Sequence, residues 1–290
     1  MTLLLHHEFS PVFSDQRQEI DRILGTNGEV FREISSRKTL RFLYSGKPYF
    51  LKIHRGVGWR EIFKNLLQLR LPIISAHTEW KALHKLGSLG IDTLTPVGFG
   101  SYGWNPARKQ SFLITRELGE SVTLQDMFSQ KLTPQYPPRV KRNLIRKVAE
   151  ITRIMHKNGV NHRDYYLCHL RVLVSDLYSK TIENPRVFVL DLHRAQLRAR
   201  TPVRWIIKDL GALLFSCGET GITQRDVFRF LRKYCNKNLR DILLQEKRFW
   251  EAVMAKTSKI KTHHQRISTR QETSIPKWIP NKAKYLRKPT

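Results

Sequence analysis

Two aspartates of this chain lie where a carboxylate can do chemistry, and each follows a different kind of segment. Asp164 closes the string Asn-His-Arg-Asp at 161–164, in a loop between a long helical pattern and a predicted hairpin. Asp191 follows the apolar strand predicted over 187–190. A carboxylate held at a rigid strand end suits a hard cation such as Mg²⁺, which prefers oxygen ligands. The pattern is therefore compatible with metal-assisted chemistry.

Two opposite charges lie upstream of these aspartates. Lys52 lies inside a strand predicted over 49–54, and Glu79 lies on a helix predicted over 75–86, after Ser75 as an N-cap candidate. An ion pair between strand and helix would hold the Lys52 ammonium group in a fixed position.

The order of these residues resembles the catalytic pattern of protein kinases. There the aspartate of His-Arg-Asp, here Asp164, accepts the proton of the substrate hydroxyl, and the aspartate at a strand end, here Asp191, binds Mg²⁺. His169 stands where kinases carry a metal-binding asparagine, so we expect a metal ligand or a phosphate contact there. Asp209, at the start of a predicted helix, is expected to anchor the backbone of the catalytic loop.

The sequence lacks the glycine-rich loop of protein kinases. Residues 35–39 fill the turn between the first two predicted strands, and Arg37 and Lys38 would hold phosphate there by charge. Small-molecule kinases of this fold often lack the loop. Its absence therefore argues against a protein kinase rather than against a kinase.

Several strings resemble the lipopolysaccharide core heptose kinase family of Gram-negative bacteria, over about residues 25–240. The strings lie at 27–33, 36–42, 64–67, 161–169, 191–196 and 221–226. The resemblance implies ATP- and Mg²⁺-dependent phosphorylation of the first heptose of the inner core. It also implies acyl carrier protein as a partner and peripheral contact with the cytoplasmic face of the inner membrane.

The resemblance to the catalytic pattern of protein kinases, together with the charges that replace the glycine loop, assigns the site. Asp164 is the predicted catalytic base, and Asp191 and His169 are the predicted metal ligands. The residues predicted at the nucleotide are Lys52, Glu79, Arg37 and Lys38.

Such a site needs a two-lobed, protein-kinase-like fold of the α+β class. Residues 1–117 are predicted as a small β-rich lobe, 118–255 as a mostly helical catalytic lobe and 256–290 as a basic tail. The clearest helix is predicted over 139–158, ended by Gly159. The segment 59–71 is predicted as an amphipathic helix packed on the core, in preference to one that lies on a membrane.

The charge balance points to an anionic partner. The chain has 290 residues, with 52 Lys and Arg against 24 Asp and Glu, for a net charge of +28. Such a field attracts nucleic acid, anionic lipid or phosphorylated glycans. Nucleic acid is disfavoured because neither an RNP-like aromatic string nor zinc-finger spacing occurs.

The sequence also predicts the compartment. It has three cysteines without CxxC spacing, which suits a reducing environment. Neither a signal peptide nor an apolar run long enough to span a bilayer is recognised, so we expect a cytoplasmic protein. Two other functions stay open: an RNA-binding or atypical protein kinase, and a kinase-like scaffold without turnover.

Overall fold

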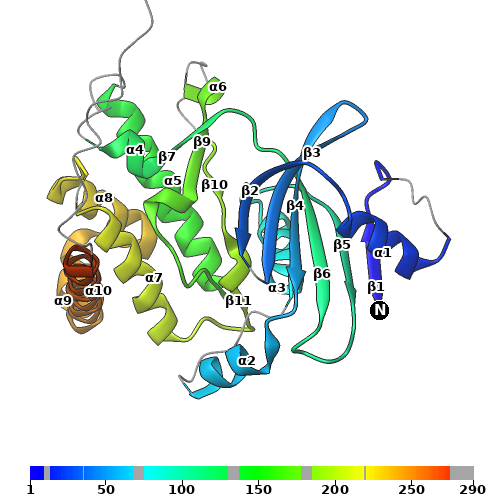
Figure 1. The fold of residues 1–290 in the computed structure, drawn as a ribbon. Helices are drawn as coiled ribbons and strands as arrows, with labels where there is room; N and C mark the ends of the chain where they lie inside the picture. The colour runs from blue at the N-terminus through cyan, green and yellow to red at the C-terminus, as the bar shows by residue number, and fades with distance from the viewer. Residues whose placement is uncertain are drawn as a thin grey trace, which may run out of the picture.

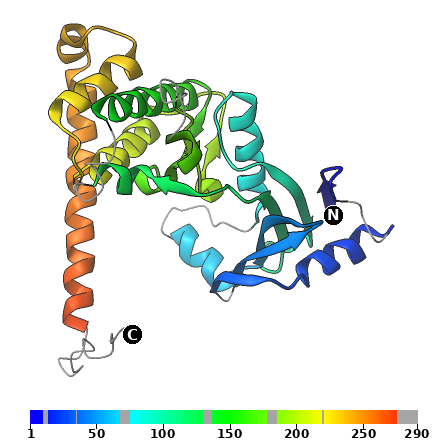
Figure 2. The ribbon, with the colours of Figure 1, turned by 90° about the horizontal axis from the view of Figure 1, so that it is seen from above.

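The computed structural model describes residues 1–9, 14–34, 36–67, 75–129, 137–177, 185–218 and 220–274. They form a β-sheet lobe and a mainly helical lobe that lie side by side (Figure 1, Figure 2).

The N-terminal lobe is built on a six-stranded antiparallel sheet in the order β1-β5-β6-β4-β3-β2. Turn residues fix its central hairpin, because Ser45 and Gly46 both adopt positive φ between β3 and β4. The strands are β1 (Thr2–Leu5), β2 (Glu29–Ile34), β3 (Arg37–Tyr44), β4 (Lys47–Arg55), β5 (Pro96–Tyr102) and β6 (Gln110–Arg116).

Helices cover both faces of this sheet. α1 (Gln16–Leu24), capped by Asp15, packs Ile20 and Ile23 into a cluster with apolar residues of β3, β4 and β6. α3 (His77–Ser88) packs on the other face, into a second cluster that continues through the helical lobe. Because β4 is central, a residue that alternates away from the α1 cluster faces α3 and the helical lobe.

The helical lobe is organised around α5 (Pro138–Lys157), which buries one apolar face and begins with proline, a residue that suits a first helical turn. Its further helices are α4 (Leu124–Phe128), α6 (Val174–Leu177), α7 (Val203–Ser216), α8 (Gln224–Cys235), α9 (Leu239–Gln245) and α10 (Lys247–Ser274). Two 3₁₀ turns, η2 (Leu167–His169) and η4 (Leu192–Arg194), lie among them.

Short strands complete this lobe and hold its loops. β7 (Ser121–Thr123), β9 (Leu170–Leu173) and β10 (Phe188–Val189) form a three-stranded sheet in the order β10-β9-β7. β8 (Val160–Asn161) pairs with β11 (Gln196–Leu197). The predicted pairing of 170–174 with 187–190 is therefore confirmed as the antiparallel pair β9–β10.

α10 lies along α7 and then extends beyond the lobe (Figure 2). Gly211 of α7 allows this approach, because a Cβ atom there would lie 2.8 Å from the Lys256 side chain. α10 carries the chain through residues 256–274 of the predicted tail, and 275–290 lie outside the described residues. The domain boundaries at 117 and 255 stay predictions.

The segment predicted to pack on the core behaves differently. α2 (Gly58–Leu67) buries Ile62, but Trp59 is 50% and Phe63 57% exposed, so the expectation that this face packs inside is wrong. An amphipathic sequence pattern predicts a helix with one apolar face, but it does not predict whether that face packs on the protein core. Residues 68–71 of the predicted helix lie outside the described residues. No described helix has the length and apolar character needed to cross a membrane.

Candidate active site

The predicted ion pair between Lys52 and Glu79 is present. The Lys52 ammonium nitrogen on β4 lies 2.5 Å from Glu79 Oε1, in the first turn of α3. A carboxylate at a helix N-terminus is stabilised by the helix dipole. Burial opposes the charge on Lys52, but Glu79 and then Asp191 outweigh it and raise the Lys52 pKa. Lys52 therefore stays cationic and points a fixed charge toward the helical lobe.

The loop that carries Asp164 is held by backbone contacts at both ends. Gly159 turns the chain out of α5 with φ +75°, and a Cβ atom there would lie 1.7 Å from the carbonyl oxygen of Arg198. Asp209 on α7 accepts hydrogen bonds from the backbone N–H groups of His162, at 2.7 Å, and Arg163, at 2.8 Å. The prediction that Asp209 anchors this loop is confirmed.

Asp164 itself faces a cation. Nη1 of Arg194, on η4, lies 3.0 Å from Asp164 Oδ1 and 3.1 Å from Oδ2. Two carboxylate oxygens offer about four acceptor positions, so one donor leaves room for a second hydrogen bond. The preceding residue, Arg163, has φ 74°, a left-handed backbone that costs a non-glycine residue about 1–3 kcal/mol and concentrates at functional sites.

Asp191 also has a left-handed backbone, at φ 61° and ψ 50°. Its carboxylate accepts a short hydrogen bond from Nδ1 of His193. Burial opposes the negative charge, but His193, His169 and Lys52 outweigh it and hold the pKa of Asp191 well below its usual value. Asp191 is therefore an anionic oxygen donor between the two lobes.

His169 links the two aspartates. Its Nδ1 lies 2.7 Å from the backbone oxygen of Asp164, and its Nε2 lies 3.5 Å from Asp191 Oδ2. A carbonyl oxygen only accepts, so Nδ1 carries a proton and donates it. In the neutral ring, the Nε2 lone pair then faces a carboxylate, and either a second proton or a cation relieves that repulsion.

The same contacts set the charge of His169. Burial disfavours its imidazolium form, yet the Cys168 side chain, the Asp164 carbonyl and Asp191 together raise the pKa to about 9. A metal ion would displace that proton, as it does at other histidine ligands. The donor set of Asp191 and His169 thus fits a divalent cation.

Arg37 and Lys38 lie in strand β3, and the alternation of the strand separates them. Arg37 pairs in register with His54, and Thr39 with Lys52, so Arg37 and Lys52 share one face. Lys38 pairs in register with Ile53 on the other face and lies 3.6 Å from Glu33. The structure brings Arg37 toward Asp191 and Arg194, whose charges act on it, but it does not bring Lys38 there.

Some residues of the site were left open or missed at the sequence level. His193 and Arg194 lie two and three positions after Asp191, and the sequence leaves their role undecided between contact with the substrate and a structural one. Lys208 was passed over, although it precedes Asp209. Burial, and then Arg163, lower the pKa of Lys208 to about 8, against the opposing effect of Asp164. Its position beside Asp209 was the one available signal.

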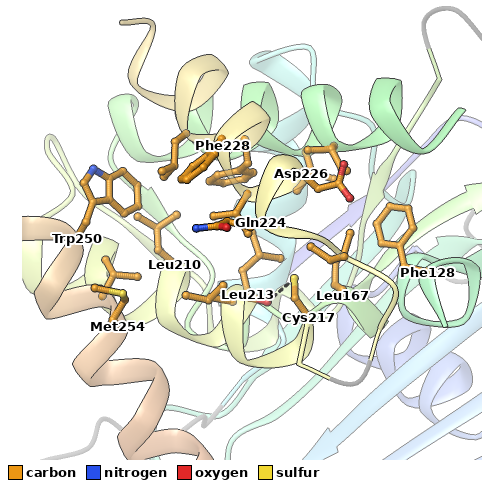
Figure 3. Close-up of a pocket in the computed structure, with 18 of the residues that line it drawn as sticks. Phe128, Leu167, Leu210, Leu213, Cys217, Gln224, Asp226, Phe228, Trp250 and Met254 are labelled. Carbon is orange, nitrogen blue, oxygen red and sulfur yellow. Dashed lines mark hydrogen bonds between the residues drawn. The ribbon is translucent and has the colours of Figure 1, made fainter. Parts of the chain in front are cut away.

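A separate cavity of about 500 Å³ lies in the helical lobe and is lined almost entirely by apolar side chains (Figure 3). α7 contributes Leu210 and Leu213, Cys217 follows the end of α7, and α10 contributes Trp250 and Met254. Burial raises the pKa of the Cys217 thiol to about 12, and Cys217 Sγ donates to the carbonyl oxygen of Leu213 at 3.3 Å. Such a wall accepts hydrocarbon rather than a charged group.

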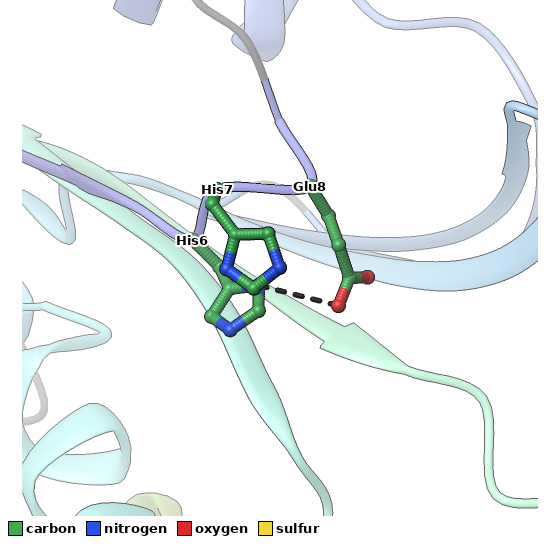
Figure 4. Close-up of side chains that lie close together, drawn as sticks. All are labelled: His6, His7 and Glu8. Carbon is green, nitrogen blue, oxygen red and sulfur yellow. Dashed lines mark ion pairs between the residues drawn. The ribbon is translucent and has the colours of Figure 1, made fainter.

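One close group of metal-ligating residue types occurs among the described residues, formed by His6, His7 and Glu8 (Figure 4). Glu8 accepts a hydrogen bond from Tyr49 at 2.9 Å and pairs with Arg116 as well as with His6, whose Nδ1 lies 3.2 Å away. The Arg116 charge disfavours a cation there. This group ties the chain after β1 to the sheet.

The model of the lipopolysaccharide kinase (Kdo/WaaP) family matches residues 21–234. The chain belongs to this family. The family resemblance predicted above is therefore confirmed, and the chain is a kinase, a phosphotransferase that uses ATP.

Individual members of the lipopolysaccharide kinase family cover most of the chain. The lipopolysaccharide core heptose(I) kinase WaaP of Escherichia coli is 45% identical over 245 residues, which is 84% of this chain and 92% of that protein. Its counterpart in Pseudomonas aeruginosa is 44% identical over 247 residues, 85% of this chain and 91% of that one.

A solved structure of WaaP in complex with acyl carrier protein matches with a TM-score of 0.74 at 37% identity, over 89% of this chain and 99% of that chain. The predicted α+β, kinase-like fold is confirmed.

Proposed function

We propose that the chain transfers the terminal phosphoryl group of ATP to a hydroxyl of the first heptose of the lipopolysaccharide inner core. Relatives that are 44–45% identical bear the name core heptose(I) kinase. The observation that carries the proposal is the bridge of His169 between the backbone of Asp164 and the carboxylate of Asp191. This bridge holds a base and a metal ligand in one place.

Each residue then has a role that follows from its contacts. ATP with Mg²⁺ supplies the phosphoryl group and neutralises its charge when bound. Lys52, fixed by Glu79, binds phosphate oxygens, and Arg37 adds charge on the same face. Asp191 and His169 hold the metal. Asp164, oriented by Arg194, accepts the hydrogen bond and then the proton of the sugar hydroxyl. Lys38, on the other face of β3, stays a prediction as a nucleotide ligand.

The test is phosphate transfer by the purified chain. Core oligosaccharide without phosphate on its first heptose, incubated with the chain, ATP and Mg²⁺, gains the mass of one phosphoryl group, and NMR locates it on that heptose. ATP turnover that leaves the heptose unmodified contradicts the proposal. Phosphorylation of RNA or protein in its place favours the atypical protein kinase, and the absence of turnover favours the scaffold.

We also propose that acyl carrier protein is a partner. The solved relative was obtained with it, and an acidic carrier protein complements a net charge of +28. The apolar cavity suits a hydrocarbon chain (Figure 3). Size-exclusion chromatography of the chain with purified acyl carrier protein gives a shared peak, whereas separate elution at low salt contradicts this partner.

The third proposal is peripheral contact with the anionic cytoplasmic leaflet of the inner membrane, through α2. Trp59, Phe63 and Leu67 recur at i, i+4 and i+8 and are all exposed, and Arg60 and Lys64 are exposed on the same helix. Aromatic residues beside cations are typical of interfacial helices.

A neighbouring loop adds to this surface. The backbone N–H of Gly58 donates to the carbonyl oxygen of Ala107 at 3.0 Å, and the β5–β6 loop to which Ala107 belongs presents Trp104, 99% exposed. Co-sedimentation with phosphatidylglycerol-containing vesicles is expected for the intact chain. It is expected to fall in a Trp59→Ser/Phe63→Ser variant but not in Leu244→Ser, and equal sedimentation of all three contradicts this surface.

A further inference from the structure

A single indole ring in the first turn of α7 is surrounded by positive charge. The guanidinium carbons of Arg163, Arg198 and Arg204 lie 5.2, 5.8 and 5.5 Å from the centre of the Trp205 ring. The ammonium nitrogen of Lys208 lies 5.5 Å from the same centre. These four cations and Trp205 are called the Trp205 cluster below.

Arg198, Arg204 and Lys208 form no ion pair with an acidic residue in the part of the chain that the structure describes. The nearby acids are engaged elsewhere: Asp209 accepts two backbone N–H groups, and Asp164 pairs with Arg194. Arg163 disfavours the charge on Lys208 and lowers its pKa, and an anion bound among these cations would offset such repulsion.

Two further features of this region suit an anion. Nε1 of Trp205 is buried and has no hydrogen-bond acceptor among the described residues. Buried N–H donors almost always have an acceptor, so this indole N–H is available to donate to a bound group. The N-terminus of α7, which begins at Val203 after Pro202, has no side-chain cap. The helix dipole at this end also attracts negative charge, while the backbone N–H groups of Trp205 and Ile206 already donate to the carbonyl oxygen of Pro202.

Part of the cluster is already organised to bind. Arg198 donates from Nη1 to Asn161 Oδ1 and from Nη2 to Gln196 Oε1, both at 2.7 Å, so its guanidinium plane is fixed. A planar guanidinium group matches the two oxygens of a carboxylate or phosphate group. The cluster thus offers fixed donors of the geometry that an acidic group requires.

The place of the cluster relates it to the acceptor. Arg163 directly precedes Asp164 in the chain, and Lys208 directly precedes Asp209, the anchor of the same loop. The proposed nucleotide residues Lys52 and Arg37 lie on the opposite lobe, on β4 and β3. An anion at Trp205 would therefore lie on the helical-lobe side of Asp164, where a molecule that presents its hydroxyl to Asp164 would extend.

We propose that the Trp205 cluster is an anion-binding subsite for an acidic group, a carboxylate or a phosphate, on the sugar acceptor. The subsite rests on the proposed function, because it assumes that Asp164 receives the acceptor hydroxyl. It gives the substrate class a chemical requirement: a hydroxyl to be phosphorylated, with an acidic group held a short distance away. A neutral sugar without the acidic group would present its hydroxyl to Asp164 but would make no contact with the Trp205 cluster.

The test compares acceptors that differ only in charge. The full chain phosphorylates soluble core oligosaccharide, the same oligosaccharide with its carboxylates methyl-esterified, and one pretreated with phosphatase. Arg204→Gln and Lys208→Gln are compared with Arg225→Gln, which removes an exposed cation of α8 outside the cluster. For the untreated acceptor, the acceptor KM is expected to rise about tenfold in both cluster variants, while the KM for ATP and the control stay unchanged.

The chemical treatments identify the acid. If a carboxylate is bound, esterification raises the KM of the intact chain about as much as Arg204→Gln does, and the two changes together add nothing further. If a phosphate is bound, phosphatase treatment has that effect instead. A KM that responds neither to the variants nor to the treatments overturns the subsite. A fall in kcat on all acceptors alike, at unchanged KM, also overturns it, because the cluster then only supports the loop.

A separate measurement keeps the subsite apart from the kinase proposal. Inorganic phosphate is expected to raise the melting temperature of the intact chain and of Asp164→Asn equally, and to raise that of Arg204→Gln less. This pattern supports the subsite even if the chain phosphorylates neither acceptor, in which case the proposed function alone fails. Equal responses of the intact chain and Arg204→Gln overturn the subsite, whatever the activity.

Discussion

The candidate site between the lobes and the cavity of the helical lobe have opposite linings, although one helix contributes to both. Near its middle α7 supplies Lys208 and Asp209 beside the catalytic loop, and the adjacent Leu210, with Leu213 one turn further on, lines the cavity. The site is held by ion pairs between segments that are distant in sequence, such as Lys52 with Glu79. The cavity wall has few polar groups.

This difference separates two kinds of contribution to the protein. Charged groups at fixed positions stabilise charge that develops in a reaction, so their loss is expected to reduce rate more than stability. Apolar walls contribute by excluding water, so their loss is expected to reduce stability more than rate. Substitutions in the two regions should therefore move different observables.

The largest expected effect follows from Asp164→Asn. An amide cannot accept the hydroxyl proton, so kcat is expected to fall about 10²- to 10⁴-fold. The melting temperature should stay close to that of the unchanged chain, because the partly exposed pair with Arg194 contributes little to stability. Asp241→Asn, on α9, is the matched control. Normal phosphate transfer by Asp164→Asn would contradict the role of Asp164 as the catalytic base, and with it the expected difference between the polar site and the apolar cavity.

The cavity provides the converse experiment in Leu213→Ala. Leu213 is 6% exposed and belongs to the main core cluster, so truncation is expected to lower the free energy of unfolding by about 2–5 kcal/mol. The kcat per folded molecule should be unchanged. Urea unfolding measures the loss, and Leu244→Ala, at a site that is 70% exposed, should change stability by less than about 0.5 kcal/mol. A large loss of kcat in folded Leu213→Ala would show that the regions are not separable.

Glu79→Gln sharpens the comparison within the polar site. Loss of the Glu79 charge releases Lys52 from its partner at 2.5 Å, and we expect the KM for ATP to rise roughly tenfold. Glu61→Gln is the control, because Glu61 faces Lys64 across 3.5 Å on the exposed surface of α2, where a pair contributes under about 1 kcal/mol. Equal effects of the two substitutions on the KM for ATP would contradict the role of Glu79 in positioning Lys52.

The smallest expected effect is a dependence of stability on pH that His54 introduces. Burial, and then Arg37 and Lys52, lower the pKa of His54 from 6.5 to about 3. Below pH 6.5 the unfolded chain therefore binds a proton at His54 that the folded chain does not, and stability falls as pH falls. One such group gives about 1.4 kcal/mol per pH unit. Urea titrations between pH 5 and 6.5 should show a shallower slope in His54→Gln, and an unchanged slope would contradict this assignment.

Local patterns explain what the sequence could predict. Lys52 within an alternating strand, Glu79 on the next helix and Asp191 after an apolar run are each fixed by segments of a few residues, and their order follows from the chain. Asp209 was predicted as an anchor from the resemblance to kinase-like folds, in which an aspartate at the start of this helix holds the catalytic loop. The site residues were thus accessible without knowledge of long-range packing, although their roles stay proposals.

Tertiary packing decides the rest. Arg194 reaches Asp164 across 30 positions, and four cations from three segments meet at Trp205. Lys38 is a second example of what the sequence did not predict. It lies on the opposite face of β3 from Arg37, because neighbouring residues of a strand point to opposite faces. The exposed apolar face of α2 was not predicted either, because an amphipathic pattern predicts a helix but not what its apolar face contacts.

The three cysteines have a consequence for chemical probes of this enzyme. Cys168 is exposed and lies four positions after Asp164, whereas Cys217 and Cys235 are partly buried thiols whose pKa values burial raises to about 12. Electrophiles react with thiolates, so the two partly buried cysteines are poor targets at neutral pH. A mild acrylamide carried by a ligand of the active site therefore has one cysteine to modify, which makes the chain a candidate for selective covalent inhibition.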